Sequence, residues 1–277
     1  MKRKDQITFH VYARLNPVNL QDVLPHQVKK AIDEQWPLLV PTGTVEYHGP
    51  HLPFGVDTFI VEELCHRVAE RVKCLIAPPF WYGPTGYAVT GPDQGTVDVS
   101  TERFGRHVKD VLGSFWDMGF HTIIVCIHHQ QMDGPEALAI RQAAAEVTFE
   151  KSLAERGPTW WGKAPLPMSD NVFERIQAWP SVLPHAAEHG VVMADHAGFY
   201  ETALIMAAKR NLVDLDRLTV EPVPWYCATE TSQAREATVE AGERMWQAMV
   251  DAWVERLPVW LRRAPLKPSE VTLQGLF

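Results

Sequence analysis

The sequence predicts an α/β protein, in which a parallel-rich sheet carries helices on both faces. Short apolar runs typical of buried strands alternate along the chain with segments that have the periodicity of amphipathic helices. The 277 residues, of which 46% are hydrophobic, suffice for one large domain with a sizeable core. We therefore expect a single domain over residues 1–277, with an insertion or arm near 157–185, where prolines and tryptophans interrupt the alternation.

These patterns assign the elements in chain order. An apolar residue at every fourth position predicts a helix over 57–73, and the run 121–127 is the clearest buried strand. Residues 1–16 form an extended lead-in, and the glycine-, proline- and aromatic-rich segment 79–95 is a long loop over a site. Helices are expected over 19–35, 57–73, 101–118, 136–156, from about 196 to 208, and over 232–257; strands over 37–41, 74–78, 121–127 and 191–194; and a loop over 222–230.

Charge and composition exclude several classes of partner. The formal net charge is -8 and no block of lysine or arginine occurs, which argues against nucleic-acid binding. No stretch reaches the roughly 20 apolar residues of a membrane span, and no apolar signal-peptide core follows the polar start. The four cysteines form no CxxC pair, which favours reduced thiols. We expect a soluble, cytoplasmic protein.

The loop that follows the first strand carries the strongest chemical signal. Between its glycines and prolines lie Glu46, His48, His51 and Asp57. Glu46 and His48 are two residues apart, so their side chains point to the same side of an extended segment. Carboxylate oxygens together with imidazole nitrogens suit Zn²⁺, Mn²⁺ or a similar divalent ion.

Two further polar clusters also follow predicted strands. They are His128 with His129, and Asp195 with His196 and Glu201. In a doubly wound sheet the carboxyl ends of the strands meet at one crevice, so five or six such side chains would bind one or two metal ions. Each cluster alone also fits a structural role, since aspartates cap helices and histidines at strand ends are often only hydrogen-bonded. The cap interpretation does not explain Glu46, His48 or Glu201.

At these residues the sequence resembles a known family. The segment 43–57, Gly-Thr-Val-Glu-Tyr-His-Gly-Pro-His-Leu-Pro-Phe-Gly-Val-Asp, is similar to the creatininase (creatinine amidohydrolase) signature, G-[ST]-x-E-x-H-G-x-H-L-P-x-x-x-D. The run 196–202, His-Ala-Gly-Phe-Tyr-Glu-Thr, resembles the later family motif H-A-G-x-x-E-T. The resemblance spans roughly residues 35–210. It implies a three-layer α/β/α sandwich with two divalent metal ions, Zn²⁺ and/or Mn²⁺.

The resemblance also implies roles for single residues. Asp57 would bridge the two ions, and His196 matches the position that handles a proton during ring opening. The family commonly forms hexamers built from dimers, so a homo-oligomer is expected. The metal ligands carried over by position are Glu46, His48, Asp57, His129 and Glu201.

One segment departs from the family pattern. The family usually has N-G-H-G-G-N after the central strand, whereas this chain has Ile127-His-His-Gln-Gln-Met132. Gln131 stands where creatininase itself has a glutamate, and an amide cannot exchange a proton as a carboxylic acid does. We expect Gln131 at the catalytic position and His128 beside the substrate, with creatinine itself in doubt as that substrate.

Aromatic side chains are expected to line the substrate pocket. Tyr82 and Tyr87 lie in the predicted loop, and Trp161, with Trp160 and Trp179, falls where the family has aromatic pocket walls. His51 is expected to brace its loop rather than bind metal.

Three interpretations of function follow. The first is a metal-dependent hydrolase that opens a small cyclic substrate at a carbonyl, breaking a C–N bond as creatininase does. The second is hydrolysis of a C–C bond in a cyclic diketone, as in inositol catabolism by 3-dehydro-scyllo-inosose hydrolase. The third, which Gln131 favours, is a non-catalytic metal-binding relative. A nucleotide-binding protein ranks last, because no GxGxxG motif follows the first strand.

Overall fold

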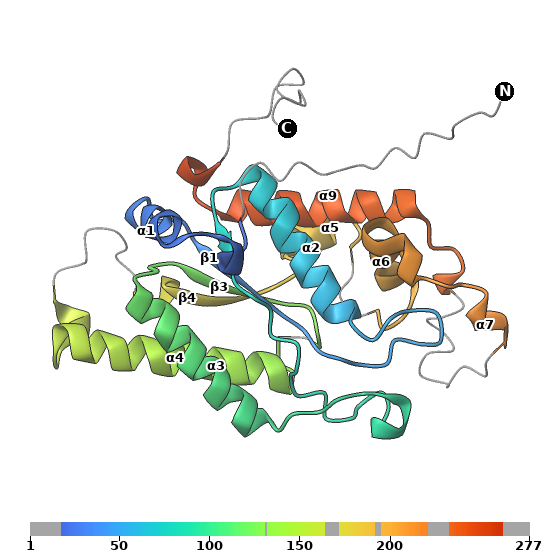
Figure 1. Cartoon of the computed structure of the whole chain (residues 1–277), viewed down its shortest axis with the longest axis horizontal. Coiled ribbons are helices and arrows are strands. Elements are labelled where there is room, and N and C mark those ends of the chain that lie inside the picture. The colour runs from blue at the N-terminus through green and yellow to red at the C-terminus, as the bar shows by residue number, and fades with distance from the viewer. Residues whose placement is uncertain (1–17, 131, 164–171, 192–194, 221–232, 263–277) are drawn as a thin grey trace, which may run out of the picture.

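The chain folds into three layers (Figure 1) in a computed structural model that describes residues 18–130, 132–163, 172–191, 195–220 and 233–262. A four-stranded parallel sheet lies between α3 and α4 on one face and α2, α6 and α9 on the other. The α/β/α prediction is therefore confirmed. The strands are β1 (Leu38–Thr42), β2 (Leu75–Ile76), β3 (Ile123–Ile127) and β4 (Ile176–Pro180), and the helices are α1 (Pro25–Asp33), α2 (Val56–Arg71), α3 (Thr101–Met118), α4 (Pro135–Arg156), α5 (Pro184–Glu188), α6 (Phe199–Lys209), α7 (Arg217–Val220) and α9 (Val239–Arg256).

The sheet has the strand order β2-β1-β3-β4, with all pairs parallel. The two central strands are paired from Leu38 with Ile123 to Thr42 with Ile127, so they end at the same level. The loops that follow β1 and β3 consequently leave from neighbouring points on one edge of the sheet. This is the edge at which open parallel sheets bind ligands.

Both faces of the sheet are buried at its centre, which explains why β1 and β3 are almost continuous apolar runs. Alternate residues of each strand enter different cores. Leu39 of β1 and Ile124 of β3 pack in the core shared with α2, α6 and α9. Leu38 and Val125 pack in the core shared with α3 and α4.

The structure differs from the sequence prediction in the second half of the chain. The strand β4 lies inside the predicted insertion near 157–185, where it pairs with β3 along its whole length. The long helix begins at Val239 rather than at 232, because Thr238 caps it by accepting a hydrogen bond from the Ala241 amide at 3.1 Å. The expected lead-in over 1–16, the loop over 222–230 and most of the strand over 191–194 lie outside the described residues.

The predicted loop after β2 contains only a short 3-10 turn, Pro92–Gln94. Its end is tied to the loop after β1, since the Val97 amide donates to the Val45 carbonyl at 2.9 Å and the Tyr47 amide donates to Thr96 Oγ1 at 3.2 Å. Among the described helices, none has the length and apolar content to cross a bilayer.

Candidate metal centre

Five buried side chains with metal-ligand chemistry meet beside the carboxyl ends of β1 and β3. They come from the loop after β1, the first turns of α2 and α6, and the end of β3. Their ligand atoms form two triads, and within each triad these atoms lie within 4.8 Å of one another. The triads share Asp57. One contains Glu46, Asp57 and His129, and the other contains His48, Asp57 and Glu201.

Close backbone packing positions the shared aspartate. Asp57 lies in the first turn of α2, which the loop after β1 crosses at Gly43. A Cβ at Gly43 would lie 2.5 Å from the Thr58 amide nitrogen, so only glycine permits this approach. The neighbouring Thr44 then donates its hydroxyl to Asp57 Oδ2 at 2.6 Å, which fixes the orientation of the carboxylate.

The hydrogen bonds of His48 identify its ligand nitrogen. Its Nδ1 lies 3.0 Å from the Glu46 carbonyl oxygen, which can only accept, so Nδ1 carries a hydrogen. Its Nε2 lies 3.5 Å from Asp57 Oδ1 and 3.7 Å from Glu201 Oε2. Nε2 is therefore the nitrogen available to a cation held between these carboxylates.

His129 faces the other side of Asp57. Its Nδ1 lies 3.2 Å from Asp57 Oδ2 and 3.3 Å from Glu46 Oε2, so Nδ1 is the nitrogen directed at the first triad. The next residue, Gln130, has a φ of 58°. This is the left-handed region of backbone conformation, which residues other than glycine rarely adopt. Such strained conformations gather at functional sites, where the surrounding structure holds them.

Glu201 is fixed from two directions. Its Oε2 accepts a hydrogen bond of 2.6 Å from the Ala197 amide, and Ala197 also has a positive φ, 56°. Its Oε1 lies 3.4 Å from Nε2 of His128, whose Nδ1 is within 2.7 Å of Ser181 Oγ. The structure thus brings His128 to the edge of the second triad, 6% exposed.

The electrostatics of the cluster suit a cation. Burial alone would lower the pKa of His48, but the negative charges of Glu201, Asp57 and Glu46 raise it to about 10. Burial alone would raise the pKa of Asp57, but the nearby His48 and His129 hold it well below its usual range. Within the described residues, His48 Nε2 and Glu46 Oε1 are buried without a hydrogen-bond partner. Such groups are costly unless a cation compensates them, so the donor set fits divalent ions.

His196 lies beside this cluster with one ring nitrogen already bonded. Its Nε2 lies 3.0 Å from the Tyr47 carbonyl, to which it must donate, and its ring centre lies 4.4 Å from that of His48. Its Nδ1 is consequently the nitrogen that can accept a proton.

Of the aromatic residues predicted to line the substrate pocket, some lie near the cluster and others do not. Tyr82 and Tyr87 are 59% and 45% exposed, on the loop whose Thr85 carbonyl accepts a hydrogen bond of 3.5 Å from the Gln130 side chain. The structure does not bring Trp161 to the centre: it is 69% exposed, packs on Phe173, and follows the carboxyl-terminal end of α4.

Two other predicted residues have no described place in the site. Trp179 packs against Trp253 in the core beneath α9, and Gln131 lies outside the described residues.

The sequence prediction missed Glu136, in the first turn of α4. The side chain is 0% exposed, and neither carboxylate oxygen has a hydrogen-bond partner in the described part of the chain. Burial raises its pKa to about 8, opposed by the charge of His129 and reinforced by Asp57 and Glu46. No sequence signal distinguishes it, because acidic residues are common in the first turn of any helix.

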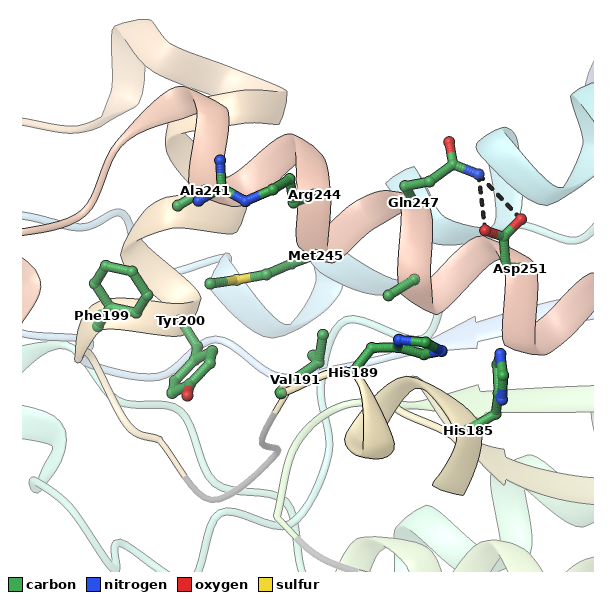
Figure 2. Close-up of a pocket in the computed structure, with 12 residues that line it drawn as sticks. His185, His189, Val191, Phe199, Tyr200, Ala241, Arg244, Met245, Gln247 and Asp251 are labelled. Atoms are coloured by element: carbon green, nitrogen blue, oxygen red, sulfur yellow. Dashed lines mark hydrogen bonds between the residues drawn. The ribbon is translucent and has the colours of Figure 1, made fainter.

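A separate surface pocket of about 440 Å³ lies between α5, the start of α6 and α9 (Figure 2). His185, His189, Tyr200 and Asp251 are among the residues that line it, and Gln247 donates two hydrogen bonds of 3.0 Å to Asp251. None of the five cluster residues lines this pocket, so it is distinct from the candidate centre.

Comparison with known proteins assigns the chain to a family. The family model Creatininase, described as creatinine amidohydrolase, matches residues 22–257. The chain belongs to the creatininase family. This confirms the family resemblance, and the two ligand triads are formed by residues of its two motifs together with His129.

The relatives within the creatininase family differ in how much of the chain they match. Creatinine amidohydrolase of Pseudomonas putida is 25% identical over 244 residues, 80% of this chain and 90% of that protein. The 3-dehydro-scyllo-inosose hydrolase of Thermotoga maritima is 34% identical over 114 residues, 41% of this chain and 36% of that protein. The chain therefore aligns with only about a third of the latter relative's length.

Solved creatininases have the same fold. A structure of creatinine amidohydrolase covers 87% of this chain and 96% of its own, with a TM-score of 0.68 and 20% identity. Others, described as a Zn-Zn type and as a Mn form, have TM-scores of 0.67. At this level of identity the similarity establishes the fold alone.

Proposed function

We propose that the protein is a binuclear metal-dependent hydrolase that opens a small cyclic substrate at a carbonyl carbon. The observation that carries the proposal is the sharing of Asp57 by two triads of buried ligand atoms. Carboxylates and imidazoles together suit Zn²⁺ and Mn²⁺, and the Zn-Zn and Mn forms of solved creatininases support the same pair of metals. When bound, two such ions polarise a carbonyl and lower the pKa of water.

The residues of the chain hold the ions and move the proton. Glu46 and His129 would hold one ion and His48 and Glu201 the other, with Asp57 shared by the two sets of donors. His196, anchored through Nε2, accepts a proton at Nδ1 from the water that attacks the carbonyl carbon, and returns it to the leaving atom of the ring.

Residues around the centre orient the substrate. The exposed Tyr82 and Tyr87 contact the ring from the loop above His129. His128, held by Ser181, contacts it at the edge of the second triad. Gln131, at the position where creatininase has a glutamate, hydrogen-bonds the substrate through its amide, because it cannot exchange a proton.

The bond that is cleaved has two candidates. Cleavage of a C–N bond in a cyclic amide is supported by the match to creatinine amidohydrolase along most of the chain. Cleavage of a C–C bond in a cyclic diketone is supported by the higher local identity to 3-dehydro-scyllo-inosose hydrolase. The imidazole of His128 and the amides of Gln130 and Gln131 provide several hydrogen-bond donors, which suit a polyhydroxylated ring. Turnover of a panel of cyclic amides and keto-inositols distinguishes the two.

We also propose a homo-oligomer in a reducing compartment such as the cytoplasm. Apolar side chains on and beside the second half of α4 are exposed, and patches of this kind mark subunit contacts. The described cysteines Cys65, Cys74 and Cys126 are buried free thiols, which supports a reducing compartment. The exposed side chains are Phe149, Leu153, Trp161 and Phe173.

Replacement of the shared ligand tests the proposed function. We expect Asp57→Asn to lose at least one metal ion per chain and at least 100-fold in turnover, because the amide is neutral and binds a cation weakly. Metal content is measured by inductively coupled plasma mass spectrometry. Turnover is measured on the panel of cyclic amides and keto-inositols. The control, Asp251→Asn, alters a carboxylate on α9 that pairs with Arg71 and should keep both properties. An unchanged metal content and turnover in Asp57→Asn would refute the proposal. Bound metal without turnover in the unaltered protein would favour a non-catalytic relative.

A further inference from the structure

Glu136 is a buried carboxyl group that the proposed chemistry does not use. It belongs to α4, on the opposite face of the sheet from α2 and α6, which carry the carboxylates of Asp57 and Glu201. Neither Glu136 oxygen has a hydrogen-bond partner among the described residues, although the side chain is 0% exposed. Burying a carboxyl group without hydrogen-bond partners costs free energy of folding. A group of this kind in a folded protein therefore calls for an explanation, such as a functional role or a bound water.

The backbone is shaped to admit this side chain. A Cβ on Gly83 would lie 2.3 Å from Glu136 Oε1 and 3.1 Å from the methyl group of Thr44. Any larger residue at Gly83 would therefore displace the carboxyl. Thr44 also donates its hydroxyl to Asp57, so one residue neighbours both the space beside the Glu136 carboxyl and a member of the first triad.

A candidate partner for the Glu136 carboxyl is the second ring nitrogen of His129. The Nδ1 of His129 faces Asp57 and Glu46, whereas its Nε2 is buried without a partner in the described part of the chain. Among charged groups, His129 has the largest effect on the pKa of Glu136, and the charge of Glu136 in turn raises the pKa of His129. A histidine that binds metal through one nitrogen commonly donates the N–H of the other to a carboxylate, which fixes its tautomer and orientation.

We propose that Glu136 is a positioning residue of the metal centre, whose carboxylate accepts a hydrogen bond from Nε2–H of His129 through one buried water. This rests on the proposed function, because it takes His129 as a metal ligand through Nδ1. With this role, the helical layer of α3 and α4 also contributes to metal binding. Glu136 lies outside both family motifs. His48 needs no such carboxylate, because the Glu46 carbonyl already accepts its second N–H.

Zinc affinity of Glu136 variants tests this role. Glu136→Met keeps the size of the side chain but removes the acceptor, and Zn²⁺ affinity should fall by about 10- to 100-fold, as for other residues that orient metal ligands. Glu136→Gln keeps an acceptor oxygen and should lose less. Gly83→Ala, which displaces the carboxyl, should weaken binding as well. The control is Glu150→Met on the same helix, whose exposed carboxylate pairs with Lys109. Affinities are measured by competition with a chromophoric chelator.

Two further measurements separate positioning from packing. The metal-free Glu136→Met protein should melt no lower than the unaltered protein, because the substitution removes a buried, unpartnered carboxyl. Nitrogen-15 spectra of the zinc-loaded protein should show His129 protonated at Nε2. Unchanged zinc affinity in Glu136→Met, or a loss of affinity matched by a lower melting temperature without metal, would overturn the inference. Absence of zinc binding in the unaltered protein would instead refute the proposed function.

Discussion

The histidines of the centre are distinguished by what their second nitrogen contacts. His48 and His196 each donate one N–H to a backbone carbonyl, of Glu46 and Tyr47 respectively. Backbone carbonyls neither titrate nor move with a side chain, so these two rings keep one tautomer. Among the described residues His129 has no such carbonyl, and its orientation depends on the side chains around it. The centre thus combines two histidines fixed by the backbone with one that needs a further residue.

His51 provides a prediction at the scale of a single residue. It is 2% exposed, its Nε2 lies 3.0 Å from Thr202 Oγ1, and burial together with the charge of His48 lowers its pKa to about 4. The unfolded value is about 6.5. The folded state therefore favours the neutral ring, and its contribution to stability is complete above pH 6.5 and is lost as the pH falls from 6.5 towards 4. We expect this loss to be a few kcal/mol at most.

His51→Gln should remove this part of the pH dependence. Urea unfolding at several pH values between 4 and 7, with a chelator present, measures the difference between the variant and the unaltered protein. His26→Gln, on the exposed face of α1, is the control. A stability difference between His51→Gln and the unaltered protein that does not vary with pH would contradict the assignment.

At the scale of elements, the position of Glu201 depends on the contact between α6 and α9. Gly242 of α9 packs on the backbone of α6, where a Cβ would lie 2.0 Å from the Ala203 carbonyl oxygen and 2.8 Å from the Ala207 Cβ. Ala203 is two residues beyond Glu201, so α9 supports the helix that presents this ligand. The glycine is needed for close approach, although it lowers helix propensity.

We expect Gly242→Ala to lower the free energy of unfolding by about 1–3 kcal/mol, because the added methyl group forces the helices apart. It should also weaken zinc binding by displacing Glu201. The matched control is Gly113→Ala in α3, where the nearest atom is 3.9 Å away, and which should raise stability by up to about 1 kcal/mol. Chemical denaturation and chelator competition measure both effects. Equal stability changes in the two variants would show that the helix contact is not close in solution.

At the scale of the whole molecule, one surface carries a cluster of exposed apolar side chains. The aromatic side chains beside the second half of α4 stack on one another, with Trp161 5.0 Å from Phe173 and Phe149 5.3 Å from Trp160 between ring centres. The cluster lies towards the end of α4 remote from the metal centre. This exposure supports the proposed homo-oligomer, because a substrate bound at the candidate ligands of the same subunit would lie at the other end of α4.

Phe149→Glu should shift the protein from an oligomer towards a monomer, since a charge in the centre of an apolar contact is costly to bury. Light scattering coupled to size-exclusion chromatography gives the mass. Leu24→Glu changes an equally exposed apolar residue outside the cluster and should leave the mass unaltered. A monomeric unaltered protein would contradict the proposed oligomer.

The sequence predicted those parts of the molecule that depend on local patterns. The β3 run and the periodicity of α3 are strong, and the five ligand residues lie in or beside motifs with dense glycine and proline. The strand β4 was missed because its sequence, Ile-Gln-Ala-Trp-Pro, mixes polar and apolar residues, and pairing with β3 decides its conformation. Glu136 was missed, and the distance of Trp161 from the candidate centre was not foreseen, for the same reason: contacts distant in sequence determine the surroundings of both residues.

The sharing of Asp57 between two triads has a consequence for biosynthesis. One triad is complete once His129 has been made, whereas the other waits for Glu201. At about 5–20 residues per second, several seconds of translation separate the two. A nascent chain thus contains the donors for one ion before those for its companion exist, and a fragment that ends ahead of α6 contains the donors of the first triad but lacks Glu201 of the second.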